Sequence, residues 1–196
     1  MSGSPDELPL SFQNELGIVC VVDTSVLIKL KRLVSIDDQW DFLLRMTELV
    51  RSKRLAFPRQ VAKELAYGQY PDAPGAWIGS AKRNVSHPEP SEVSLRMVLT
   101  VADRLVDAEA TNDREPADPY VAAMACEIPR RYPGCRSVVA TDDRVDRLPL
   151  KLSLVTACDR LRLEHWAPEQ FIAWVNGDTN SSDWPDGAPV VSLASP

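Results

Sequence analysis

Apolar and polar positions along the chain follow two alternating patterns. Short unbroken apolar runs, typical of strands buried on both faces of a sheet, occur at Ile18–Val22 and Ser137–Thr141. Shorter strands are predicted at Leu55–Phe57, Leu152–Val155 and Leu163–Trp166. Between these runs, apolar residues recur three and four positions apart, as on one face of a helix. Since strands separated by helices favour parallel pairing, the pattern predicts an α/β fold: a three-layer α/β/α sandwich around a central, mainly parallel sheet.

The predicted helices begin beside residues suited to a helix N-terminus. Asp23, Thr24 and Ser25 offer side-chain oxygens that can cap a helix running to Leu33. Asp118 would cap a helix that has a proline in its first turn. The remaining helices are expected from Asp37, after Pro58, around Trp77–Arg83, over Glu92–Ala110 and from Pro168.

Charge separates the ends of the chain from its centre. The chain has 28 acidic and 22 basic residues, a formal net charge of −6. Residues 1–15 and 176–196 each carry three acids and no base, so residues 16–175 are neutral overall. The tail is rich in Ser, Gly, Asn and Pro, which is typical of disorder. We predict a flexible extension over 1–15, one folded domain over 16–175 and a disordered acidic tail over 176–196.

Composition excludes several classes of protein. No apolar run approaches the roughly 20 residues that a membrane-spanning helix needs, and the first ten residues do not resemble a secretory signal. The four cysteines are scattered, and the two histidines have no metal-like spacing, so a zinc site is not predicted. These features predict a cytoplasmic protein with no membrane partner.

Acidic residues follow the two buried strands. Asp23 comes directly after the first, and Asp142 and Asp143 follow the second. Because ligand sites of such folds gather at the carboxyl ends of parallel strands, these acids are candidates for a shared site. Carboxylates that converge there repel one another unless a cation is present, and oxygen-only ligands favour Mg²⁺ or Mn²⁺.

Each acid also has a plain structural interpretation. Asp23 and Asp118 are suited to capping helices, and Glu64 fits a solvated helix position. Asp142 and Asp143 fit a turn after a strand. Taken singly these signals are weak, and their order and spacing are more informative.

In that order the acids lie within four segments. These are Val-Val-Asp-Thr-Ser-Val-Leu-Ile at 21–28, Phe-Pro-Arg-Gln-Val-Ala-Lys-Glu-Leu at 57–65, Ala-Asp-Pro-Tyr-Val-Ala-Ala-Met-Ala at 117–125 and Val-Val-Ala-Thr-Asp-Asp at 138–143. Together they resemble the motifs of the PIN-domain nucleases, a superfamily of metal-dependent ribonucleases that includes the VapC-type toxins. The resemblance extends over residues 18–175.

This resemblance implies a metal-dependent endoribonuclease that cleaves single-stranded RNA. The implied catalytic residues are Asp23, Glu64, Asp118 and Asp143, of which Asp23, Asp118 and Asp143 would hold Mg²⁺ or Mn²⁺. The implied supporting residues are Thr24, Ser25, Thr141 and Asp142. The resemblance also implies the toxin role of a toxin–antitoxin pair, with a cognate antitoxin protein as partner, and a homodimer.

Two features depart from the commonest PIN pattern. The chain is longer between Glu64 and Asp118 and between Asp143 and Val155. Two acids stand where one is expected, so the fourth acid could be Asp142 or Asp143. The spacing from Thr141 favours Asp143.

Basic residues near the motifs are candidates for contact with RNA phosphates. Arg144 and Arg147 follow the last motif, and Lys29 follows the first. A solvated face is the plain alternative for such charges.

Other functions fit less well. Haloacid-dehalogenase-type phosphatases need a second Asp two residues after the first, where this chain has Ser25. Response-regulator receiver domains need a late lysine, and the context of Lys151 does not match. A non-catalytic PIN-like module that binds nucleic acid or protein stays an alternative, although all four acids are present.

Overall fold

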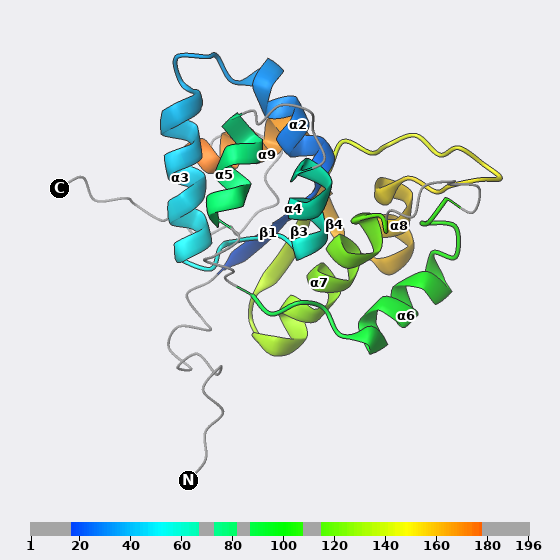
Figure 1. Ribbon diagram of the computed structural model, residues 1–196. Helices are drawn as coiled ribbons and strands as arrows, with labels where there is room; N and C mark the ends of the chain where they lie inside the picture. The colour runs from blue at the N-terminus through cyan, green and yellow to red at the C-terminus, as the bar shows by residue number, and fades with distance from the viewer. Residues whose placement is uncertain (1–16, 67–72, 82–86, 108–114, 178–196) are drawn as a thin grey trace, which may run out of the picture.

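A four-stranded sheet forms the centre of the protein in a computed structural model that describes residues 17–66, 73–81, 87–107 and 115–177 (Figure 1). The strands are β1 (Ile18–Val22), β2 (Leu55–Ala56), β3 (Arg136–Ala140) and β4 (Glu164–Trp166), in the order β2-β1-β3-β4. All their pairings are parallel. The predicted extensions, 1–15 and 176–196, lie outside the described residues, apart from Asn176 and Gly177.

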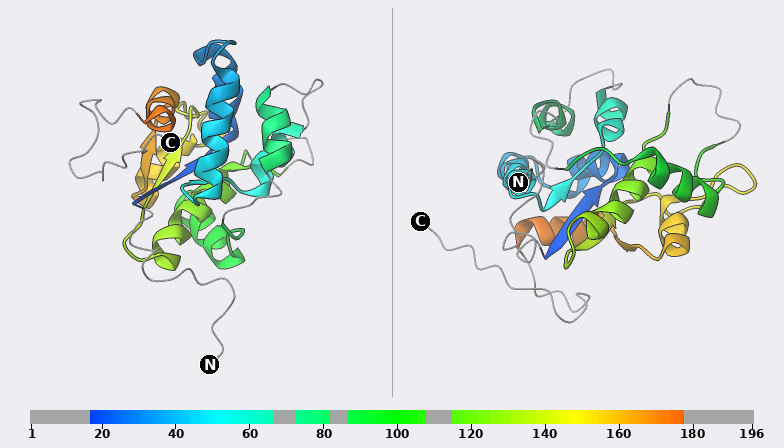
Figure 2. Two further views of the ribbon diagram at one scale, coloured as in Figure 1. Left: turned by 90° about the vertical axis from the view of Figure 1, so that its left-hand side faces the viewer. Right: turned by 90° about the horizontal axis from the view of Figure 1, so that it is seen from below.

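Helices cover both faces of this sheet. They are α2 (Thr24–Leu33), α3 (Gln39–Arg51), α4 (Arg59–Ala66), α5 (Ala73–Ala81), α6 (Glu92–Val101), α7 (Asp118–Arg131), α8 (Leu154–Leu161) and α9 (Pro168–Asn176). On one face α7 packs on β1 and β3 and contacts α6 and α8. On the other, α9 contacts α2 and α3, as Figures 1 and 2 show. The predicted three-layer α/β/α architecture is therefore confirmed.

Four of the predicted elements need correction. The helix expected around Trp77–Arg83 begins earlier, at Ala73, and ends at Ala81, and residues 82–86 lie outside the described part. The strand expected at Leu152–Val155 is wrong, because Ser153 caps α8 by accepting a hydrogen bond from Thr156 N at 3.2 Å. The apolar residues Leu152 and Leu154 are buried around this cap and not in a sheet. The helix expected over Glu92–Ala110 ends at Val101, and residues 108–114 lie outside the described part. Asp118 is the first residue of α7 and does not cap it.

The central strands end side by side. β1 is buried along its whole length, and its last residue, Val22, pairs with Ala140, the last residue of β3. Asp23 N donates to Ala140 O at 2.9 Å, so the pairing continues one step past the strand. This register places Asp23 and Thr141 next to each other at the carboxyl end of the sheet.

Candidate active site

Asp23 is fixed by four hydrogen bonds at the start of α2. Its Oδ1 accepts from Thr24 N at 2.7 Å, and its Oδ2 accepts from Ser25 N at 3.3 Å and Ser25 Oγ at 2.5 Å. Thr141 Oγ1, from the end of β3, donates to Oδ2 at 3.0 Å. Asp23 is therefore the predicted helix cap, and the same bonds aim a buried carboxylate at the end of the sheet.

Glu64 comes to the same place from α4. Its Oε2 accepts a 2.5 Å hydrogen bond from Thr24 Oγ1, and its Oε1 accepts one from Ala117 N at 2.7 Å. Glu64 is half-buried, so the solvated helix position considered for it is wrong. It connects the first turn of α2 to the residue just before Asp118.

Asp118 and Asp143 share one positive partner, Lys151. Lys151 Nζ lies 2.6 Å from Asp118 Oδ2 and 3.1 Å from Asp143 Oδ2. Asp143 Oδ2 also accepts from Leu154 N at 3.1 Å, and Asp143 N donates to Thr141 Oγ1 at 3.1 Å. All four predicted acids thus belong to one network of contacts.

The neighbouring aspartates Asp142 and Asp143 have different partners. Asp142 N donates to Ser25 Oγ at 2.9 Å, but the Asp142 carboxylate pairs with Lys29 Nζ at 2.6 Å. Asp143 instead shares Lys151 with Asp118. The geometry favours Asp143 as the fourth acid, with Asp142 at the margin of the cluster.

Burial and mutual repulsion make Asp23 and Asp118 costly to ionise. Burial raises the pKa of Asp23, and the charge of Glu64 raises it further, against the hydrogen bonds from Ser25 and Thr141. Burial and the charge of Asp23 raise the pKa of Asp118 to about 6, more than Lys151 lowers it. Burial alone would lower the pKa of Lys151, but Asp118 and Asp143 raise it overall, so the ammonium form is favoured.

The carboxylate oxygens of these acids are the type of ligand that a hard divalent cation such as Mg²⁺ prefers. In the described segments, no three acidic, histidine or cysteine side chains form a group that could hold a metal ion, so the implied ligand set of Asp23, Asp118 and Asp143 is not found as such a group. Mg²⁺, however, is commonly held by one or two carboxylates together with water and substrate phosphates. Asp118 and Asp143 form such a pair, since one cationic group already contacts both of them. These residues therefore fit the ion that the resemblance implies.

Lys151 is the residue of this cluster that sequence reasoning missed. It comes from the segment between β3 and α8, which extends to the right in Figure 1 before returning to the acids. Its side chain is only 16% exposed. From the sequence, Lys151 is considered only as the late lysine of a response-regulator receiver domain, and its sequence context does not match that class.

The predicted RNA-binding residues are divided between two environments. Arg144 and Arg147 are exposed on the segment after β3, and neither makes an ion pair with a described residue. Lys29 is half-buried and paired with Asp142. The two arginines are thus better placed than Lys29 for a phosphate.

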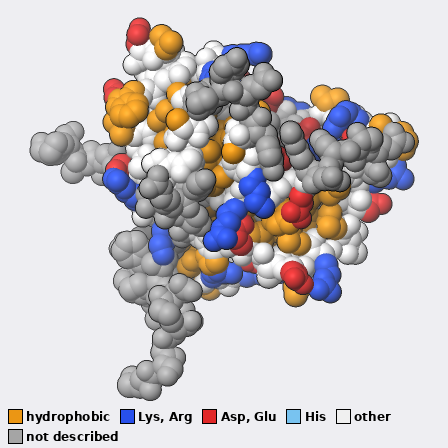
Figure 3. Space-filling view, in the orientation of Figure 1, with side chains coloured by type: hydrophobic (Ala, Val, Ile, Leu, Met, Phe, Trp, Pro, Cys, Tyr) orange, Lys and Arg blue, Asp and Glu red, His pale blue; other side chains and the backbone are white. Residues whose placement is uncertain are grey.

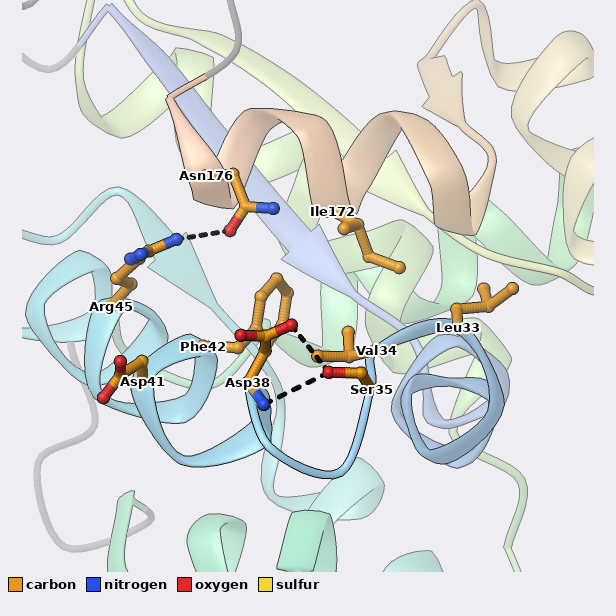
Figure 4. Close-up of a pocket in the computed structure, with 9 residues that line it drawn as sticks. All are labelled: Leu33, Val34, Ser35, Asp38, Asp41, Phe42, Arg45, Ile172 and Asn176. Carbon is orange, nitrogen blue, oxygen red and sulfur yellow. Dashed lines mark hydrogen bonds between the residues drawn. The ribbon is translucent and has the colours of Figure 1, made fainter.

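A pocket of about 200 Å³ lies elsewhere, between the α2–α3 turn and α9 (Figure 4). Phe42 and Ile172 form part of its wall, and Arg45 Nη1 donates to Asn176 Oδ1 at 2.7 Å across it. The pocket includes none of the clustered acids. It belongs to the packing between helices and does not extend the candidate site.

No protein-family model, curated protein or solved structure matches this chain significantly. Within the described residues, no helix has the length and apolar character needed to cross a bilayer.

Proposed function

We propose that the protein is a metal-dependent endonuclease that hydrolyses single-stranded RNA. One observation carries this proposal: four acids meet in one network, with a cationic group between two of them. They come from the residue after β1, from α4, from α7 and from the segment after β3. Buried carboxylates that repel one another are stabilised by a cation, and hydrolysis of a phosphodiester needs positive charge close to the phosphoryl group.

The side chains of the cluster would have different roles in the proposed reaction. Asp118 and Asp143 would hold Mg²⁺ or Mn²⁺, with the negative charge of Asp23 beside them. Such an ion would place positive charge beside the phosphoryl group and would lower the pKa of the attacking water. Thr141 and Ser25 keep Asp23 in place. Exposed Arg144 and Arg147 would hold neighbouring phosphates of the strand.

In this reaction, the water oxygen forms a bond to phosphorus as one phosphorus–oxygen ester bond breaks. The products are a phosphomonoester and a free hydroxyl group, and no oxidant or further substrate is needed. Glu64 supports the site by holding Thr24 and the backbone before Asp118. The acids thereby keep their spacing while the substrate binds.

The test is cleavage of a labelled single-stranded RNA by purified protein during a Mn²⁺ titration. We expect Asp23→Asn to lower the rate by roughly 10- to 100-fold, the usual cost of losing a supporting partner at a metal site. The matched control is Asp159→Asn, the same chemical change at an exposed α8 residue paired with His165. A wild-type protein that cleaves no RNA with Mn²⁺ or Mg²⁺, or an Asp23→Asn variant as active as the control, would sink the proposal.

We infer further, from the family resemblance, that this nuclease is the toxin of a toxin–antitoxin pair and acts in the cytoplasm. All four cysteines are free, which suits a reducing compartment. Exposed apolar side chains are visible at the upper left of Figure 3. Ile36, between α2 and α3, is 83% exposed, and Trp40, in the first turn of α3, is 71% exposed. Exposed apolar groups of this kind favour contact with a protein, an antitoxin or a second copy of the chain. Expression that leaves bacterial growth unchanged would contradict the toxin role.

A further inference from the structure

Lys151 places a positive charge between two of the proposed ligand carboxylates. Its Nζ is 2.6 Å from Asp118 Oδ2 and 3.1 Å from Asp143 Oδ2. The Lys151 and Asp118 side chains are 16% and 11% exposed, so water screens this contact only weakly. The ammonium group therefore occupies the position that a cation shared by the two acids would need.

The backbone around Lys151 is ordered by its own hydrogen bonds. Lys151 N donates to Arg147 O at 3.1 Å, and Arg147 N donates to Lys151 O at 2.8 Å. The next residue, Leu152, is buried, and its N donates to Arg104 O at 2.7 Å. This turn holds the backbone of Lys151 in place, so the fold itself brings the lysine within reach of the acids.

We propose that Lys151 is a tethered counter-ion that a divalent cation displaces from Asp118 and Asp143, so that Lys151 sets the cation affinity of the site. The inference rests on the function proposed above. An ammonium group and a divalent cation repel each other and compete for the same carboxylate oxygens. A divalent cation that binds there must therefore displace Lys151 from Asp118 and Asp143. When divalent cations are scarce, the ammonium group of Lys151 occupies the site.

The direct test is Mn²⁺ binding to wild type and to Lys151→Met, measured by titration calorimetry without RNA. We expect the variant to bind Mn²⁺ roughly 10- to 100-fold more tightly, the range for a charge-assisted hydrogen bond that no longer has to be broken. Lys151→Gln, which removes the charge but keeps a donor, provides a second variant if the methionine variant does not fold.

Lys29→Met is the matched control. Lys29 also contacts an aspartate at 2.6 Å, but that aspartate is Asp142, which shares no positive partner with Asp118. The same loss of an ammonium group should leave the Mn²⁺ affinity within about twofold of wild type, because Asp142 lies at the margin of the cluster. A general effect of removing one positive charge would instead tighten Mn²⁺ binding equally in both variants.

A measurement on the unaltered protein completes the test. Amine labelling followed by mass spectrometry should show Lys151 reacting several-fold faster with Mn²⁺ than with EDTA, since displacement frees its amine. Equal labelling, or a Lys151→Met affinity equal to that of wild type, overturns the inference and leaves the nuclease proposal standing. Tighter binding without RNA cleavage in any form supports the inference and overturns the nuclease. If neither wild type nor the lysine variants bind Mn²⁺, both proposals fail.

Discussion

Asp23 and Glu64 are held by neutral donors, whereas Asp118 and Asp143 share a positive charge. Asp23 and Glu64 accept from hydroxyl groups and backbone N–H groups, with Thr24 contacting both. Asp118 and Asp143 are joined by the ammonium group of Lys151. The hydrogen bonds of Asp23 and Glu64 link elements of the fold to one another. Asp118 and Asp143 are instead connected by ion pairs to one lysine.

This difference separates two ways of stabilising buried acids. Neutral donors fix the geometry and lower the pKa of Asp23, but burial outweighs them, so this pKa stays raised. A charged partner offsets the charge and can be exchanged for another cation. The predictions below test whether the two pairs respond differently.

The largest expected effect is on the pH dependence of stability without divalent cations. Folding raises the pKa of Asp118 from its usual 3.8 to about 6, so between these values the folded protein keeps a proton that the unfolded chain has released. The contribution of Asp118 to the free energy of unfolding is therefore greatest below pH 4 and is lost as the pH rises through about 6. The change amounts to at most about 3 kcal/mol.

Urea unfolding in EDTA at pH 4, 5, 6 and 7 measures this dependence. Relative to Asp118→Asn, the wild type should lose free energy of unfolding as the pH rises from 4 to 6. If the free energy of unfolding changed with pH in the same way in both proteins, Lys151 would already offset the charge of Asp118 in full. The two pairs of acids would then not differ in their response to pH.

Thr141→Val should weaken the neutral pair. The buried Thr141 hydroxyl donates to Asp23 Oδ2 and accepts from Asp143 N, so valine leaves both groups without this partner. We expect a loss of about 1–3 kcal/mol in the free energy of unfolding, measured with urea at pH 7. Mn²⁺ should not restore the stability that Thr141→Val loses, because the missing contact is a neutral hydrogen bond. If Mn²⁺ fully restored the free energy of unfolding of Thr141→Val, the proposed difference between the two pairs of acids would be wrong.

Much of the fold could be predicted from the sequence, because its signals were local. Asp23 and Asp143 lie in fairly specific local motifs, whereas Glu64 and Asp118 were picked out only by the order and spacing of the four segments. The apolar run at Ile18–Val22 and the acid after it lie within a few residues, as does the spacing from Thr141 to Asp143. The architecture followed from the alternation of strands and helices. The functional assignment stays a prediction.

The role of Lys151 could not be predicted in this way. It lies 33 positions after Asp118 in the chain, and the two meet only because a turn between β3 and α8 leads back to the sheet. No periodicity marks such a turn. A local signal did exist for α8: Ser153 stands three residues before Thr156, a spacing suited to a helix cap, and the strand interpretation of Leu152–Val155 overlooked it.

The smallest expected effect belongs to the contact between Lys29 and Asp142. The Lys29 side chain is 41% exposed, so solvent screens this ion pair far more than the contacts of Lys151. We expect Lys29→Met to change the free energy of unfolding by less than about 1 kcal/mol in urea at pH 7. A larger loss would place Asp142 inside the cluster and not at its margin.

The pairing of β1 with β3 also dictates when the acids can meet during protein synthesis. Asp23 and its partner Thr141 are 118 positions apart. A ribosome adding ~5–20 residues per second needs roughly 6 to 24 s to make that stretch. Throughout this interval the nascent chain carries Asp23 without Thr141 or Asp143, and Lys151 is made later still. A chain truncated before β3 therefore lacks Asp143 together with Thr141 and Lys151. The hydrolytic centre proposed here can form only after the chain has been made past Lys151.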